Sequence, residues 1–105
     1  MEMTNYILSI LKINLNVVWS WGFNSPKPLQ NGLSFKVQGF LHRGWVVIKY
    51  NEGSDLFDIK LFSDQLEEVK SIEGVYFDEL VDVIDDAVEY CKNYEQKVKE
   101  RYSLL

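Results

Sequence analysis

One stretch of the sequence decides the predicted fold, and from Val75 to Cys91 it is VYFDELVDVIDDAVEYC. Its apolar residues recur at steps of three and four positions, the spacing that places side chains on one face of an α-helix. These residues are Phe77, Leu80, Val81, Ile84, Ala87, Val88 and Cys91. We therefore expect a long amphipathic helix over residues 76–102, with this apolar face packed on the rest of the fold.

The same stretch predicts an acidic surface on the other side of that helix. Its carboxylates fall between the apolar positions, and we expect them to face outward. The candidate interaction residues among them are Asp78, Asp82, Asp85, Asp86 and Glu89. A solvated helix face is the plainer interpretation of such a row. The alternative is a surface that binds a basic partner or imitates a phosphate backbone.

Four short runs before this helix alternate between apolar and polar residues, the pattern of half-buried β-strands. They lie at residues 33–38, 45–50, 56–62 and 69–72. Short connections separate them, so we expect neighbouring strands to pair antiparallel, as a four-stranded β-meander over residues 33–72. We interpret the preceding segment, with Pro26 and Pro28, as a loop because proline has no backbone N–H to donate.

The first 21 residues predict one or two short helices. Thr4 or Asn5 is a suitable cap for the first helix, and Asn14 is suited to break it and cap a second. Residues 10–19 are also rich in Ile and Val, so a strand stays open as an alternative there. Together the elements predict one α+β domain over residues 1–105, with short N-terminal helices, a four-stranded antiparallel sheet and a long C-terminal helix.

The charged residues are unevenly distributed along the chain. Residues 1–50 contain five basic residues and one acidic residue, whereas residues 51–105 contain six basic and fifteen acidic residues. If the two halves form different faces of the molecule, such a surface can steer partners by the sign of their charge.

The hydrophobic segments favour a cytoplasmic protein that does not interact with membranes. No run approaches the roughly 18 apolar residues that a membrane-spanning helix needs. Residues 1–21 do not fit a signal peptide, because Glu2 precedes their apolar part, Lys12 interrupts it and no small-residue cleavage site follows.

The residue types that carry most enzyme chemistry are sparse. His42 is the only histidine and Cys91 the only cysteine, so a zinc site would lack ligands. The sequence contains no glycine-rich phosphate loop and no serine nucleophile motif. We therefore predict no catalytic residues, no bound metal and no cofactor.

Four aromatic residues are candidates for a binding surface: Trp19, Trp21, Phe23 and Trp45. Packing in the core or between helix and sheet would also explain them. If they are exposed, they favour a protein-docking patch. The alternative is nucleic-acid binding, with bases stacked on Trp45 and with Lys36, Arg43 and Lys49 as the cations. Nucleic acid is the less favoured ligand, because the chain is acidic and has no basic run.

Three segments carry a resemblance to other proteins. They are Ser20-Trp21-Gly22-Phe23 with Pro26, then YNEGSDLF from Tyr50 to Phe57, and VYFDELV from Val75 to Val81. They resemble a set of short hypothetical proteins found on phages and mobile elements of anaerobic gut bacteria, over residues 7–91. The resemblance implies a bacterial or phage cytoplasmic setting and implies no activity and no catalytic residues.

We therefore expect a small non-enzymatic protein-interaction module, an accessory protein of a phage or mobile element. Its contacts with a partner protein would come from the Trp19–Phe23 region or from the acidic helix face. A protein that binds single-stranded or duplex nucleic acid is the alternative. A homodimer formed through Tyr94, Val98 and Tyr102, near the end of the predicted helix, is a separate expectation.

Overall fold

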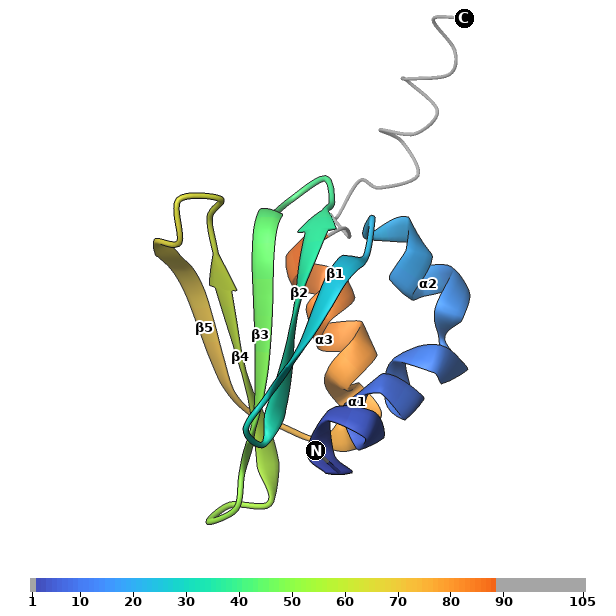
Figure 1. The fold of residues 1–105 in the computed structure, drawn as a ribbon, viewed down its shortest axis with the longest axis vertical. Helices are drawn as coiled ribbons and strands as arrows, with labels where there is room; N and C mark the ends of the chain where they lie inside the picture. The colour runs from blue at the N-terminus through green and yellow to red at the C-terminus, as the bar shows by residue number, and fades with distance from the viewer. Residues whose placement is uncertain (1, 89–105) are drawn as a thin grey trace, which may run out of the picture.

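The computed structural model describes residues 2–88 and confirms the α+β class (Figure 1). Its described helices are α1 (Glu2–Ile13), α2 (Leu15–Ser20) and α3 (Leu80–Val88), the last preceded by the 3₁₀ turn η1 (Phe77–Glu79). The strands are β1 (Asn24–Leu29), β2 (Gly32–Gln38), β3 (Arg43–Asn51), β4 (Leu56–Phe62) and β5 (Glu68–Val75). Residues 10–19 are therefore mostly helical, and the alternative of a strand there is wrong.

The strands form one antiparallel meander in the order β1-β2-β3-β4-β5, so the sheet has five strands rather than the predicted four. The interpretation of the segment before β2 as a loop is wrong, because Asn24–Leu29 pairs with β2. Strand β1 lies at the edge of the sheet, where it has a partner on one side only. Pro26 and Pro28 are exposed there, and an edge strand tolerates prolines that a central strand would not.

Strand β5 is longer than the predicted run of residues 69–72. It begins at Glu68 and continues through Glu73 and Gly74, where we expected the strands to have ended. The pairing of β4 with β5 shifts register at two places, and Gly74 adopts a φ of +71°. These irregularities interrupt the apolar–polar alternation, so the pattern marked only the middle of the strand.

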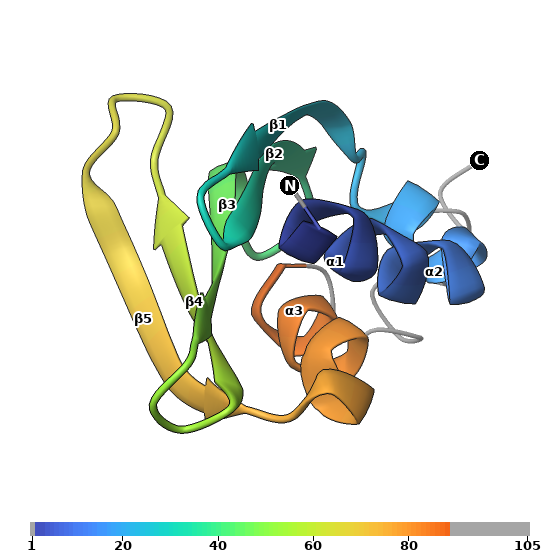
Figure 2. The same ribbon diagram turned by 60° about the horizontal axis from the view of Figure 1, so that its bottom comes forward.

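The described helices lie together on one side of the sheet, and the core fills the space between the two layers (Figure 2). Every second residue of β2, β3 and β4 points into this core. The strand residues in it include Leu33, Phe35, Val37, Val46, Ile48, Phe57, Ile59 and Leu61, and the helix residues include Ile7, Leu11, Val18, Leu80, Val81, Ile84 and Val88.

The apolar face of α3 packs into the core as predicted, since Leu80, Ile84 and Val88 are fully buried. Two positions were predicted wrongly. Phe77 is 56% exposed, because it lies in the 3₁₀ turn and not on the α-helical face. Asp85 is turned partly inward instead of facing solvent.

The described C-terminal helix is short, not long. The 3₁₀ turn and α3 together span Phe77–Val88, and the predicted continuation over residues 89–102 lies outside the described residues. The backbone carbonyl of Val88 accepts hydrogen bonds from the N–H groups of Leu41 (2.8 Å) and His42 (3.2 Å). The β2–β3 connection thus satisfies a carbonyl in the last turn of α3.

The N-terminal helices are held to the sheet by a buried threonine. Helix α1 begins at Glu2, so both predicted caps, Thr4 and Asn5, lie inside it and the prediction of a cap there is wrong. The Thr4 hydroxyl donates to the carbonyl of Gly32 at 2.7 Å and so ties α1 to the start of β2. Asn14 separates α1 from α2 as predicted, but its side chain makes no capping hydrogen bond.

The packing of α3 predicts a large difference between two substitutions on that helix. Ile84→Ala should lower the free energy of unfolding by about 2–5 kcal/mol, because it leaves a cavity in the core. Asp82→Ala, on the exposed side of the same helix, is the matched control and should change it by less than about 0.5 kcal/mol. Urea unfolding followed by circular dichroism measures both values. Equal effects would contradict the placement of the apolar face in the core.

Candidate functional site

The side of the sheet that faces away from the described helices is the candidate functional site, and we call it the open face. It is formed by alternate residues of the three central strands together with one residue of β1. They include Lys27, Lys36, Gln38, Arg43, Trp45, Val47, Lys49, Asp58, Lys60 and Phe62.

Trp45 lies on β3, the middle strand of the sheet, near the end at which that strand begins. In the register of the sheet it is paired with Lys36 on β2 and with Phe62 on β4. Trp45, Val47 and Phe62 are all partly exposed, so they form a continuous apolar strip across β3 and β4. Gly44 allows the close approach of these strands, because a Cβ there would lie 2.2 Å from the carbonyl oxygen of Phe62.

Two lysines hold their ammonium groups against the Trp45 ring. The Nζ atoms of Lys27 and Lys36 lie 5.0 and 5.4 Å from the ring centroid, within the range of cation–π attraction. Such contacts are worth about 0.5–1 kcal/mol each at exposed sites. They place two positive charges directly beside the partly exposed Trp45 ring.

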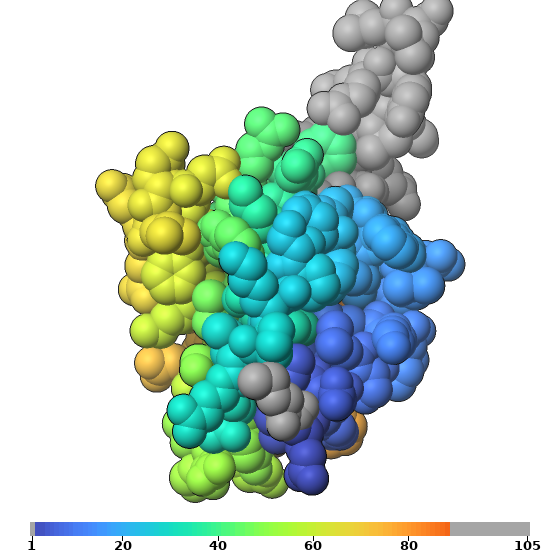
Figure 3. Space-filling model, in the orientation of Figure 1, coloured from blue at the N-terminus to red at the C-terminus, as the bar shows by residue number. Residues whose placement is uncertain are grey.

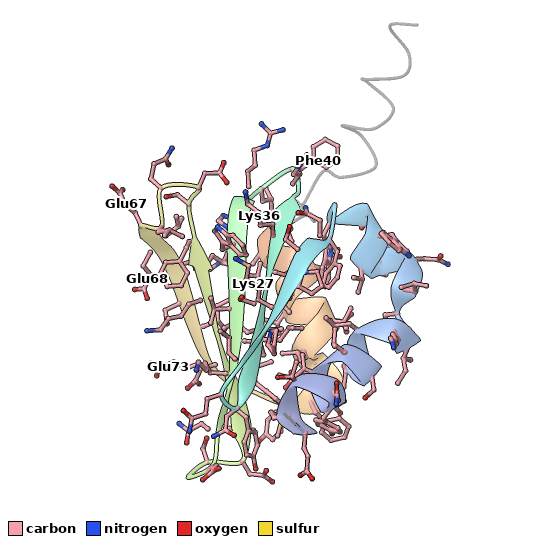
Figure 4. All side chains as sticks on the ribbon, viewed as in Figure 1. Lys27, Lys36, Phe40, Glu67, Glu68 and Glu73 are labelled. Carbon is pink, nitrogen blue, oxygen red and sulfur yellow. The ribbon has the colours of Figure 1, made fainter. Side chains whose placement is uncertain are left out.

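Acidic residues border the open face on the side of β5. Figure 4 shows Lys27 and Lys36 over the middle of the sheet, whereas Glu67, Glu68 and Glu73 follow β5. Lys60 and Glu68 form an exposed ion pair at 3.4 Å. In the space-filling view, the residues that join β4 to β5 lie on the opposite side of the molecule from α1 and α2 (Figure 3). The face is therefore basic and aromatic in its middle and acidic at one border.

A hollow of about 320 Å³ lies at one end of the open face. Its walls include Lys36, Gln38, Arg43 and Asp64, so two cations and one carboxylate share a small space. Lys36 Nζ lies 3.9 Å from Asp64 Oδ1. Lys36 and Arg43 were predicted as cations of a binding surface, whereas Asp64 was not, because no local pattern shows that the β4–β5 connection reaches β2.

The structure does not bring the four predicted aromatic residues together. Trp21 is fully buried and donates from Nε1 to Asp85 Oδ1 at 2.8 Å. Phe23 is partly buried, with its ring centroid 4.7 Å from that of Phe35. Trp19 is 62% exposed on α2, on the helix side of the molecule. Trp45 is the member of the set that lies on the open face.

The acidic helix face is narrower than predicted. Asp78, Asp82 and Asp86 are exposed, whereas Asp85 accepts the Trp21 hydrogen bond. The other residues named for interaction or self-association lie outside the described residues: Glu89, Tyr94, Val98 and Tyr102.

His42 lies in the β2–β3 connection and is buried. It is 7% exposed, and its Nε2 lies 3.3 Å from the carbonyl oxygen of Trp45. Within residues 2–88, no group of three or more His, Cys, Asp or Glu side chains is placed to hold a metal ion. None of the helices described here is both long enough and apolar enough to cross a membrane.

A second hollow, of about 660 Å³, lies between the start of α1 and the β1–β2 turn. Glu2, Met3, Tyr50 and Glu52 contribute to its walls. The Tyr50 hydroxyl donates to the Asp55 carboxylate, and this hydrogen bond is the main reason that the pKa of Tyr50 is raised. Tyr50 therefore stays protonated at neutral pH and acts as a hydrogen-bond donor.

Comparison with known proteins identifies no relative: no family model matches the chain, and neither a curated protein nor a solved structure matches it.

The different surroundings of two tryptophans predict different effects of the same substitution. Trp21→Phe removes the indole donor from a partly buried carboxylate and should lower the free energy of unfolding by about 1–3 kcal/mol. Trp19→Phe should change it by less than about 0.5 kcal/mol, because that side chain is exposed. Chemical denaturation of the two variants beside the wild type measures the difference. A Trp19→Phe effect as large as that of Trp21→Phe would contradict this assignment.

Proposed function

We propose that the protein is a small non-enzymatic interaction module that binds a partner protein through the open face, with Trp45 at the centre of the contact. The observation that supports the proposal is the one-sided cover of the sheet. Because the described helices lie on the opposite side, Trp45, Val47 and Phe62 remain partly exposed in one strip.

The make-up of the open face matches the anatomy of protein interfaces. An apolar strip with charged residues around it resembles the core and rim of such a contact. Trp and Arg are the residue types most often found at the energetic centre of an interface. Trp45 sits on a central strand between paired neighbours, so its backbone is already ordered before a partner binds.

The resemblance to phage and mobile-element proteins supports an accessory role for this module in a bacterial cytoplasm. Trp19 and the exposed carboxylates of α3, which we expected to make contacts, lie on the helix side of the molecule. They therefore do not extend the open face.

Nucleic acid is the second candidate ligand of the same face. The observation that favours it is the placement of Lys27 and Lys36 at the Trp45 ring, since single-stranded nucleic acids bind by base stacking beside cations. The acidic border along β5 and the net charge of −5 count against it.

The proposal predicts that one exposed tryptophan matters for partner binding and another does not. Affinity capture from native cells with Trp45→Ala should recover a specific partner at least about 10-fold less than wild type, because Trp anchors typically contribute 2 kcal/mol or more. Trp19→Ala, the matched control, should recover the partner as wild type does. Quantitative mass spectrometry of the captured proteins gives both ratios.

The result that contradicts the proposal is a set of captured proteins that Trp45→Ala leaves unchanged while the variant keeps the wild-type circular dichroism spectrum. Fluorescence anisotropy with labelled single-stranded and duplex oligonucleotides near 50 mM salt tests the second candidate, because phosphate contacts are strong at low salt. Binding that Trp45→Ala abolishes would favour nucleic acid.

A further inference from the structure

We infer that the hollow at the end of the open face is a carboxylate subsite, which takes an acidic side chain of the partner protein and which Asp64 occupies in the free protein. The inference rests on the proposed function, since it names the kind of segment that the open face binds.

The composition of the hollow points to an anionic group. Lys36 and Arg43 supply two positive charges on neighbouring strands, and the Gln38 amide adds hydrogen-bonding capacity. A guanidinium can donate two parallel hydrogen bonds to one carboxylate, a geometry that an ammonium lacks. The hollow adjoins Trp45, because Lys36 is the register partner of that residue and Arg43 precedes it by two positions.

Asp64 reaches this hollow from a distant part of the sheet. It belongs to the β4–β5 connection, whereas Lys36 lies on β2, with all of β3 between them. The connection is a defined turn in which the Ser63 N–H donates to Glu67 O at 2.9 Å and the Leu66 N–H donates to Ser63 O at 2.9 Å. A carboxylate of this chain is thus held at the position that a ligand carboxylate would take.

The contact that Asp64 makes is weak enough to be displaced. The two charged atoms lie 3.9 Å apart, which is longer than the roughly 2.7–2.9 Å of a charge-assisted hydrogen bond. The side chains of Lys36 and Asp64 are 40% and 53% exposed, and exposed ion pairs of this kind contribute little to stability. A partner carboxylate that bonds Arg43 at short distance therefore replaces Asp64 at small cost.

The arrangement of charges favours a short acidic protein segment over a nucleic acid. Other cations of the open face already have partners, since Lys60 pairs with Glu68 and Lys49 Nζ donates to Gln30 O at 3.0 Å. A polyanion that follows the face would also meet the carboxylates along β5. A peptide with one or two carboxylates and an apolar side chain would need only the hollow and the adjoining Trp45–Phe62 strip.

The test is a titration followed by the tryptophan indole N–H signals in ¹⁵N–¹H NMR spectra. The probe is an acetylated, amidated hexapeptide, Asp-Leu-Asp-Leu-Asp-Phe, and its control has Asn in place of each Asp. We expect the Asp peptide to move the Trp45 signal and to leave the Trp19 signal in place, with the Asn peptide at least about 10-fold weaker.

Two substitutions at the hollow should act in opposite directions. Asp64→Asn should strengthen binding of the Asp peptide about 3- to 10-fold, because it removes a resident competitor and a like charge. Arg43→Gln should weaken binding about 10-fold or more, because it removes the bidentate donor. Both residues are exposed, and the dispersion of the same spectra shows whether each variant is folded.

Three results would overturn the subsite. The first is no shift of the Trp45 signal up to about 5 mM peptide, which corresponds to binding weaker than about 3 kcal/mol. The second is a shift that is the same in Asp64→Asn and Arg43→Gln as in wild type. The third is tighter binding of a (dT)₆ oligonucleotide than of the peptide at the same salt concentration. The first two results leave the capture experiment with Trp45→Ala to judge the proposed function separately.

Discussion

The contact between the Trp21 indole and the Asp85 carboxylate joins three parts of the fold, and the apolar core packs around it. Trp21 follows α2 directly and is fully buried, with its ring stacked on Phe35 of β2 at a centroid distance of 6.3 Å. Its backbone carbonyl accepts a hydrogen bond from Gln38 at the end of β2, and its Nε1 donates to Asp85 on α3. Since a partly buried carboxylate without a donor is costly, Trp21 links the end of α2 to both β2 and α3.

This arrangement determines where a binding surface can form. With the described helices joined on the same side, the strands present their other side to solvent, and alternation along β3 carries Trp45 and Val47 there. A site built on paired strands keeps its side chains in a defined position, unlike a site built on loops. The exception is Asp64, which reaches the site from the β4–β5 connection. Its ion pair with Lys36 is long, at 3.9 Å, and exposed.

The sequence predicted the elements whose signal is local. Periodicity was sufficient for the buried stripe of α3, and alternation was sufficient for β2, β3 and β4. Prediction from local patterns failed where distant contacts override local preference. Pro26 and Pro28 predict a loop, but the edge of the sheet accommodates both prolines in a strand. Asp85 was expected to face solvent, but Trp21, 64 residues away in the sequence, donates a hydrogen bond to it. Part of the candidate site was visible, since Trp45 and its neighbouring cations were named. Asp64 depends on how the β4–β5 connection folds back, which no spacing encodes.

The two margins of the sheet differ in their capacity to add strands from another molecule. On β1, the two prolines lack donors, the register is broken between Asn24 and Lys27, and Ser25 adopts a φ of +53°. These features leave no regular ladder for an incoming chain. Side-by-side stacking of molecules needs two receptive edges. The β5 edge has no proline, but its pairing with β4 also shifts register at two places. The irregular edges of the described sheet are therefore poor templates for strands of another molecule, which protects the protein against growth by strand addition.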